Sequence, residues 1–287
     1  MYTFSDNSVY GTSVGYGGAI YAWRDLTILG GTFLNNTASH FGGAIFISSY
    51  SIDINDTVVQ ITATKDYPIL FEGNRQNTNM SDEFNSIYFE ADEYGEGTIN
   101  ATFTVEEDAS FLMYDPINSA STGNLTITKN GSGIWQFGGQ SVLNGKDTII
   151  IKEGTLRLLA GSSVMLTNAT SSFEVSPEGE IQVVINSVPV YISANDIVLN
   201  GRMSVYLDPS YSFLEAILDG DKMILMYMNI TSGNVILSNV TEIQPVFSDV
   251  IIIGDCEYML DDNPLRFEID PEDPAQGTLS LYLKKIN

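Results

Sequence analysis

Two short motifs recur near the N-terminus, and they constrain the fold more than any other feature of the chain. A Phe-x-x-Asn motif begins at Phe4, Phe33 and Phe71, and a Gly-Gly-Ala-Ile motif begins at Gly17 and Gly42. The first two Phe-x-x-Asn copies start 29 residues apart, and the two Gly-Gly-Ala-Ile copies start 25 residues apart. Repeats of this length are typical of one coil of a solenoid, in which each coil packs only on its neighbours.

The residue types favour coils made of strands and turns. A glycine pair supplies a bend that a Cβ would obstruct, and the Ala-Ile that follows begins a strand whose side chains alternate between two faces. We expect each Phe to point into the core and to stack on the Phe one coil away. Asn tolerates a left-handed turn, and Asn residues in register can form an amide ladder. Gly-Gly pairs and β-branched residues both oppose helix.

The middle of the chain keeps this strand-and-turn character. Residues 125–137 and 148–158 each read as a strand, a glycine turn and a second strand. Further short strands are predicted over residues 172–175, 180–185, 190–192, 196–199 and 203–207. Strands of four to six residues at this spacing are typical of an all-β fold.

The rhythm changes after residue 207. One short helical turn is predicted over residues 211–218, an acidic loop over 255–263 and a stiff acidic turn over 270–274. Strands are predicted over residues 222–228, 235–237, 248–253, 265–269 and 279–283. We therefore predict parallel β-helix coils over residues 1–207 and a C-terminal β cap over residues 208–287, which continues the solenoid and covers its last coil.

Charge and composition exclude several classes of protein. The 287 residues include 36 acidic and 12 basic side chains, so the formal net charge is −24. Nucleic acids and anionic membrane surfaces require a Lys/Arg footprint that this chain lacks. One Cys and one His rule out a disulfide framework and a Cys-based or multi-histidine metal site. Because 44% of the residues are hydrophobic, global disorder is excluded despite the charge.

Both N-terminal motifs, taken in alternation, resemble the polymorphic outer-membrane protein repeats of bacterial autotransporter-type surface proteins. Residues 127–158 resemble the strand repeat of autotransporter passengers, in which Thr-Lys-x-Gly-x-Gly is followed a coil later by Gly-Thr-Leu-x-Leu. Residues 111–117 are similar to a phrase that often precedes that repeat. Residues 220–225 resemble the strand that opens the C-terminal part of many passengers.

This resemblance implies a right-handed parallel β-helix that is displayed at a bacterial surface or released from it. The family's common roles are adhesion, aggregation and service as a stalk. Two departures from the family stand out: the first residues lack the basic and apolar regions of a signal peptide, and no translocator barrel follows the coils. We therefore expect association with the outer membrane through parts of a larger protein and no membrane insertion by this chain itself.

Few residues are candidates for a catalytic or metal-binding site. His40 is interpreted as a surface turn residue, and Cys256 as an incidental thiol whose reactivity neighbouring carboxylates would blunt. Asp219 and Asp221 share a probable turn. Four groups of acidic residues could supply carboxylate ligands to calcium, but none of them matches a known calcium-binding loop. We therefore interpret them as solvated surface. The groups are Glu90, Asp92, Glu93 and Glu96; Glu106, Glu107 and Asp108; Asp255, Glu257, Asp261 and Asp262; and Asp270, Glu272 and Asp273.

Two other residue groups are candidates for surface contacts. The tyrosines expected to be partly exposed, and thus able to stack on sugars or partner surfaces, are Tyr10, Tyr16, Tyr21, Tyr50 and Tyr88. Asn-x-Ser/Thr sequons begin at Asn35, Asn55, Asn79, Asn100, Asn124, Asn130, Asn168, Asn229 and Asn239. In a eukaryotic secretory setting they would mark exposed loops, so a protist surface protein stays open as a source.

The sequence thus predicts a non-enzymatic surface or secreted β-helix that acts as an adhesin or a structural stalk, without catalytic residues, cofactor or metal. Its partner would be a protein or glycan on a host or neighbouring cell. A carbohydrate-active β-helix enzyme, either a polysaccharide lyase or a glycosidase, is the first alternative. A C-terminal folding module of a larger passenger is the second. About eight coils are expected, with a height on the order of 38 Å at ~4.8 Å per coil.

Overall fold

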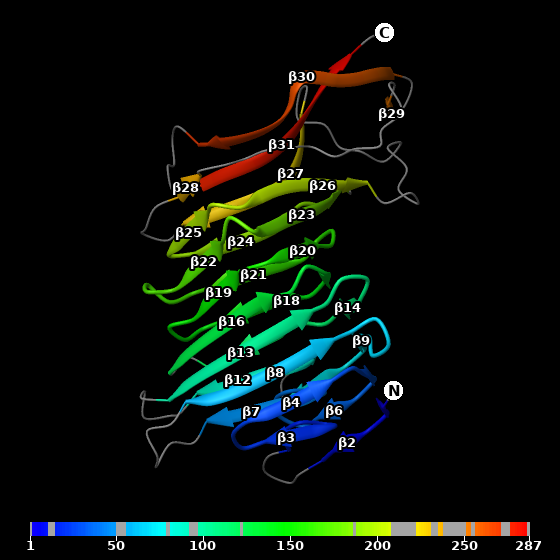
Figure 1. Cartoon of the computed structure of the whole chain (residues 1–287), viewed down its shortest axis with the longest axis vertical. Coiled ribbons are helices and arrows are strands. Elements are labelled where there is room, and N and C mark those ends of the chain that lie inside the picture. The colour runs from blue at the N-terminus through cyan, green and yellow to red at the C-terminus, as the bar shows by residue number, and fades with distance from the viewer. Residues whose placement is uncertain are drawn as a thin grey trace.

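In the computed structural model the chain is a stack of short strands wound into a parallel β-helix (Figure 1). The structure describes residues 2–10, 15–49, 56–78, 81–91, 97–120, 123–185, 188–207, 222–230, 235–237, 251–253, 256–270 and 276–285. All the regular elements among these residues are strands. The predicted all-β solenoid is confirmed.

Two faces of the solenoid are parallel sheets of eight strands, as eight coils require. Sheet A runs through β1 (Thr3–Ser5), β5 (Gly31–Leu34), β9 (Ile69–Glu72), β14 (Ser110–Met113), β17 (Ile134–Phe137), β20 (Gly154–Leu158), β23 (Gly179–Ile185) and β26 (Arg202–Leu207). Sheet D runs through β4 (Leu26–Leu29), β8 (Thr57–Ala63), β13 (Thr98–Val105), β16 (Asn124–Asn130), β19 (Thr148–Ile151), β22 (Ser172–Val175), β25 (Asp196–Leu199) and β28 (Val235–Leu237).

The third face is divided into two sheets. Sheet C comprises β3 (Ile20–Ala22), β7 (Ile45–Ser49), β12 (Ile87–Ala91) and β15 (Ile117–Ser119). Sheet E begins with β18 (Gln140–Leu143), β21 (Ser163–Leu166), β24 (Val190–Ala194) and β27 (Lys222–Ile230). Side chains bridge the break between β15 and β18. Ile117 N donates to Ser141 Oγ at 2.9 Å, and Val142 N donates to Asn118 Oδ1 at 2.9 Å.

The C-terminal end of sheet E is antiparallel. Strand β27 pairs with β31 (Gln276–Lys285), which pairs with β30 (Cys256–Ile269), and β30 pairs with β29 (Ile251–Ile253). These are the expected hairpin-like strands. The acidic loop predicted over residues 255–263 is wrong, because most of it belongs to β30. The helical turn predicted over 211–218 lies outside the described residues, and the division at residue 207 stays a prediction.

Phenylalanines stack through the core as predicted from the first motif. The ring centroids of Phe4 and Phe33 are 4.9 Å apart, and those of Phe33 and Phe71 are 4.6 Å apart, with 5° between the planes in both pairs. Phe33 and Phe71 are fully buried. The register pairs Phe4 with Phe33 and Phe33 with Phe71, so each stacked ring comes from the same place in successive coils.

The asparagines of the same motif form the predicted amide ladder. Asn7 Nδ2 donates to Asn36 Oδ1 at 2.8 Å, and Asn36 Nδ2 donates to Asn74 Oδ1 at 2.9 Å. The left-handed residue is the one before each ladder Asn: φ is 55° at Asp6, 52° at Asn35 and 72° at Gly73. The motif thus combines a core ring, a left-handed turn and a ladder rung, and only the residue assigned to the turn shifts by one position.

The glycine pairs also behave as predicted. The first glycine of each pair has positive φ, 63° at Gly17 and 68° at Gly42. The second is packed against backbone, since a Cβ on Gly43 would lie 2.5 Å from Asn85 O. The bend therefore requires glycine at both positions, one for its dihedral angle and one for space.

A buried lysine explains the Thr-Lys-x-Gly-x-Gly run. Lys129 ends the inward-facing column of β16 and has no exposed surface. Its Nζ donates to three backbone carbonyls, those of Gly131, Gly133 and Glu153, the last two at 2.7 Å. Burial lowers the pKa of Lys129 to about 8, against the opposing charge of Glu153. The lysine therefore ties the glycine turn of one coil to the start of the next.

Candidate functional site

A fourth side is present only in the first coils. Sheet B contains β2 (Ser8–Val9), β6 (Thr37–Ala38) and β10 (Arg75–Thr78) in parallel, and β11 (Ser81–Phe84) folds back antiparallel onto β10. In the fourth coil Met113, which pairs with Phe71, is followed after only three residues by Ile117, which pairs with Ile87. This coil therefore omits the side that sheet B forms in the coils before it.

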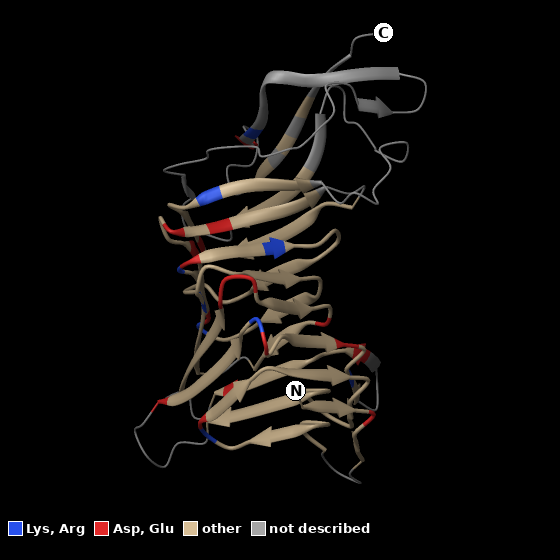
Figure 2. Cartoon of the chain, turned by 45° about the vertical axis from the view of Figure 1, so that its right-hand side comes forward, with Lys and Arg blue, Asp and Glu red and all other residues tan. Residues whose placement is uncertain are grey.

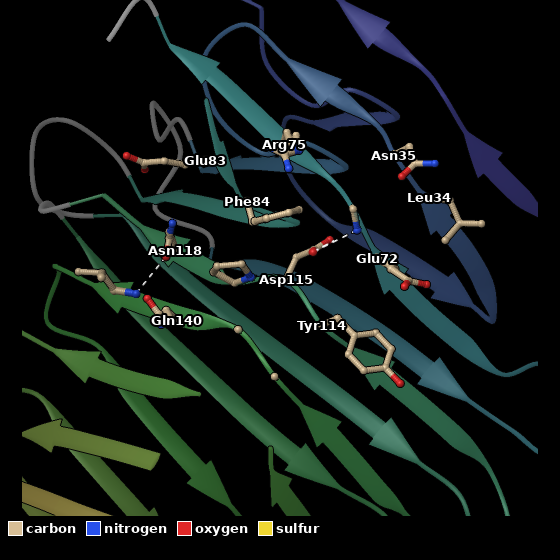
Figure 3. A pocket seen from close by; sticks show the side chains of 15 residues that line it. Leu34, Asn35, Glu72, Arg75, Glu83, Phe84, Tyr114, Asp115, Asn118 and Gln140 are labelled. Atoms are coloured by element: carbon tan, nitrogen blue, oxygen red, sulfur yellow. Dashed lines mark hydrogen bonds between the residues drawn. The ribbon is translucent and has the colours of Figure 1, made fainter. Parts of the chain in front are cut away.

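The loss of that side leaves a step in the wall of the solenoid, and a cleft of about 1180 Å³ lies at the step (Figure 3). Its lining comes from consecutive coils on both sides of the step. The lining residues are Leu34, Asn35, Glu72, Gly73, Arg75, Glu83, Phe84, Tyr114, Asp115, Pro116, Asn118, Gly138, Gly139, Gln140 and Val142. We call this feature the step cleft.

Two exposed aromatic rings line the step cleft. Tyr114 is 41% exposed and Phe84 is 48% exposed, both unusually high for aromatic side chains in a concave surface. The guanidinium of Arg75 lies 4.0 Å from the centroid of the Phe84 ring, which fixes that ring from one side. Aromatic faces of this kind stack on apolar faces of ligands, including those of sugar rings.

Carboxamide side chains add hydrogen-bonding groups to the lining that contains the Tyr114 and Phe84 rings. Asn35 is exposed, and Asn118 and Gln140 are partly exposed or exposed on the adjoining sheets. Asn118 uses its carbonyl oxygen to accept the Val142 N–H, which is the dashed bond beside Asn118 in Figure 3. Its side-chain nitrogen therefore remains to donate to another acceptor. The cleft thus combines stacking surfaces with donors and acceptors.

Asp115, although in the cleft wall, is committed to structure. It is 3% exposed, and its carboxylate accepts hydrogen bonds from Gly73 N, Asn74 N, Asn74 Nδ2 and Ser86 Oγ, at 2.8 to 3.1 Å. Three of these bonds go to Oδ2 and one goes to Oδ1. Asp115 therefore holds the step together, while Glu72 and Glu83 are exposed carboxylates in the lining.

A second aromatic group lies on the outer face of sheet C. Phe46 points away from the core but is only 1% exposed, because Tyr16 and its neighbours cover it; the Tyr16 and Phe46 centroids are 4.4 Å apart. Tyr21 and Tyr88 flank Phe46 at 5.4 and 5.9 Å. Burial, with the charge of Glu90, raises the pKa of Tyr88 to about 12. This group packs on itself, whereas the step cleft is open.

Sequence-predicted residues are spread over the molecule. His40 lies in a bend against the rings of Tyr16 and Phe41, at 5.6 and 5.3 Å. Glu106, Glu107 and Asp108 form an exposed turn, in which Asp108 pairs with Lys65 at 3.5 Å. Asp219 and Asp221 lie outside the described residues, and so does the Cys256 side chain. Within the described ranges, no three His, Cys, Asp or Glu residues could hold a metal ion.

The acidic residues mostly occupy turns and strand ends (Figure 2). Two acidic residues outside the strands are buried: Asp115 is 3% exposed and Asp147 is 1% exposed. Asp147 accepts the Ser119 hydroxyl at 2.6 Å and Gly145 N–H at 3.0 Å. Burial raises the pKa of Asp147 to about 6, although these hydrogen bonds act in the opposite direction. Both acids hold turns, and neither was singled out by the sequence.

Sequence reasoning also missed the step cleft. One signal was present: Asn7, Asn36 and Asn74 follow their motif Phe by three residues, whereas Asp115 follows Met113, the partner of Phe71, by two. Recognising that shortening requires knowing that Met113 occupies the Phe position. The register supplies this knowledge and the motif does not.

The fold and the repeated turns define a parallel β-helix. Residues 30–48, which run from the second Phe-x-x-Asn through the second Gly-Gly-Ala-Ile, match the Chlamydia polymorphic membrane protein repeat. The chain is also 24% identical over 273 residues to a probable outer membrane protein, pmp13, of Chlamydia pneumoniae. The resemblance to polymorphic outer-membrane protein passengers, predicted from the motifs, is thereby confirmed.

The alignment covers 78% of this chain and 27% of the Chlamydia pneumoniae protein, so the chain spans about a quarter of that relative. No solved structure matches the chain. Among the described residues, no helix is long and apolar enough to cross a membrane.

Proposed function

We propose that this chain is a non-enzymatic passenger, located at the cell surface or released from it, that acts as an adhesin and binds glycans through the step cleft. The surface location draws on the relative, which is a probable outer membrane protein. The binding role draws on the step cleft, which places Tyr114, Phe84 and three carboxamides in one concave surface. Concave surfaces with aromatic walls and a few polar groups are typical ligand sites.

The rigidity of the walls supports a binding role. The amide ladder and Asp115 fix the backbone on one side of the cleft, and the Asn118 bond to Val142 N fixes the other side. A site whose groups are held before the ligand arrives loses less conformational entropy on binding. A flat stalk would need no such cleft, so the adhesin role accounts for more of the structure than the stalk role.

Catalysis is the less supported role for the same cleft. A glycosidase needs two carboxyl groups with separate roles, one of them a general acid in an apolar setting. Asp115 is buried and accepts four structural hydrogen bonds, and Glu72 and Glu83 are both exposed. These carboxylates suit contacts to sugar hydroxyls better than proton transfer.

The proposal is tested by binding of the purified chain to an array of immobilised glycans. Tyr114→Ala and Gln140→Ala, together, should lower binding at least tenfold, because they remove a stacking face and an amide from the cleft. Tyr191→Ala is the matched control: Tyr191 is 50% exposed on sheet E and does not line the cleft. Wild-type binding to no glycan, or equal losses in the double variant and the control, would overturn the proposal.

A further inference from the structure

Many of the asparagines in this chain begin a sequon. Nine of the 22 asparagines begin an Asn-x-Ser/Thr sequence. The four asparagines that are buried in the structure are Asn36, Asn74, Asn85 and Asn195, and none of them begins a sequon. The six sequon asparagines with described side chains are all exposed or partly exposed: Asn35, Asn100, Asn124, Asn130, Asn168 and Asn229. Sequons and structural asparagines are thus separate sets.

Strand alternation places several sequons on one face. In β13, Asn100 and Thr102 point outward on either side of the buried Ala101. In β16, Asn124 and Thr126 do the same around the buried Leu125. The two strands are neighbours in sheet D, so both acceptor amides lie on its outer face. Alternation explains why Asn and Thr share a face. The Asn100 Nδ2 donates to Asp56 Oδ2 at 3.1 Å, and because this hydrogen bond is exposed, the amide can still be reached from solvent.

Asn168 has the most favourable geometry. It lies in the turn between β21 and β22, and its Oδ1 accepts hydrogen bonds from Thr170 N and Thr170 Oγ1, both at 3.0 Å. These two donors polarise the amide through its oxygen. Among the described residues its Nδ2 has no hydrogen-bond partner. The turn by itself would be an ordinary Asx turn, but here the second donor is the hydroxyl that the sequon requires.

We propose that Asn168 is an acceptor of N-linked glycan, with Asn124 and Asn100 as further acceptors on the outer face of sheet D. In this reaction the amide Nδ2 attacks C1 of an oligosaccharide carried on a polyprenyl diphosphate. The N–C1 bond forms, the C1–O bond breaks, and the polyprenyl diphosphate leaves while the amide loses one proton to base. Asn35 is a separate case, because it lines the step cleft.

Glycans at these positions would serve the solenoid physically. The outward-facing residues of β13 and β16 include Thr102, Thr104, Thr126 and Thr128, and none of the outward-facing residues of these two strands is charged. A long sheet without charge is prone to pairing with other sheets, and a bulky hydrated glycan prevents that contact. This role differs from the glycan-binding role proposed for the step cleft.

The test is secretion of the chain from insect cells, followed by peptide mapping before and after treatment with peptide N-glycosidase. The wild type and Thr170→Ser, which keeps the hydroxyl, should both carry glycan on the Asn168 peptide. Thr170→Val, which keeps the shape and removes the hydroxyl, should lose that glycan and retain those at Asn124 and Asn100.

An unmodified Asn168 in the wild type, or a glycan that persists in Thr170→Val, would overturn the proposal. Circular dichroism of each secreted variant shows whether the chain is folded. Because glycan-array binding uses the cleft and peptide mapping uses the sequons, failure of one proposal leaves the other standing.

Discussion

The side-chain nitrogen of Asn74 lies 3.0 Å from Oδ2 of Asp115, and this bond ends the amide ladder. The ladder ends where the solenoid loses its fourth side, because the fourth coil has an aspartate in place of another asparagine. A carboxylate accepts hydrogen bonds and donates none, so no further rung can be added below it. The chemistry of one residue thus coincides with the change in cross-section that opens the step cleft.

Asp115 should be among the most sensitive positions for stability. Asp115→Ala would remove the acceptor of Gly73 N, Asn74 N and Ser86 Oγ, while Asn74 Nδ2 would keep Phe33 O, so we expect a loss of ~3 kcal/mol in the free energy of unfolding. Urea denaturation measures this as a lower midpoint. Glu72→Ala, at an exposed cleft residue, should change stability by less than about 0.5 kcal/mol. Equal midpoints for the two variants would contradict the structural role of Asp115.

Phe33 lies between two stacked rings, so its removal should leave a cavity. We expect Phe33→Ala to lower the free energy of unfolding by about 3–5 kcal/mol, since the neighbouring coils can relax only partly. Thermal unfolding monitored by circular dichroism measures the change. Phe84→Ala removes the same side chain from an exposed position and serves as the control. A stability loss at Phe33 no larger than that at Phe84 would count against the stacked core.

Lys129 should be required for stability, because its ammonium donates to three backbone carbonyls. Lys129→Met keeps an unbranched chain but leaves three carbonyl oxygens without their donor, at a cost of about 2–4 kcal/mol. The measurement is made at pH 7, below the pKa of about 8, where the ammonium supplies all three donors. Lys152→Met, at an exposed lysine on the adjoining coil, should be nearly neutral. A neutral Lys129→Met would show that the bonds contribute no stability.

The raised pKa of Asp147 predicts that the free energy of unfolding decreases as the pH rises. Its pKa is about 6 in the folded chain against 3.8 unfolded, so the folded state binds more protons between these values. Stability from this group is full below pH 3.8 and is lost as the pH rises through 6, by about 3 kcal/mol in total. Asp147→Asn removes the dependence.

The Asp147 prediction is measured as the difference in unfolding free energy between the wild type and Asp147→Asn at several pH values from 4 to 7.5. The difference should shift in favour of the variant as the pH rises. Asp108→Asn, at an exposed residue, gives the baseline. Parallel curves for the wild type and Asp147→Asn would refute a raised pKa at Asp147.

The repeated parts of the fold were predictable because one motif carried several physical requirements at once. Phe33 signals the core, Gly43 a turn without space for a side chain, and Asn36 a rung of the ladder. Each requirement recurs at a coil's length, so the repeat itself reports the register. The predicted short strands over 172–175 and 196–199 match β22 and β25 at both ends.

The parts that failed depend on neighbours that no motif reveals. Residues 255–263 are rich in Asp, yet β29 pairs with residues 256–258 and β31 pairs with residues 258–260, so that part of the segment is a strand. The register between β30 and β31 shifts between Leu260 and Leu265, and Pro264, which lacks an N–H, lies within the shift. The step cleft was equally hidden, because it results from a missing side.

The omitted side in the fourth coil has a consequence for how such chains diverge. Sheets A and D keep their registers across the step, so one side of the coil is missing while these two faces continue without interruption. In this chain a single side of a coil can therefore be absent while the coil itself is kept. Length differences among related passengers should then be counted in sides, and each lost side creates an indentation where new surface chemistry can evolve.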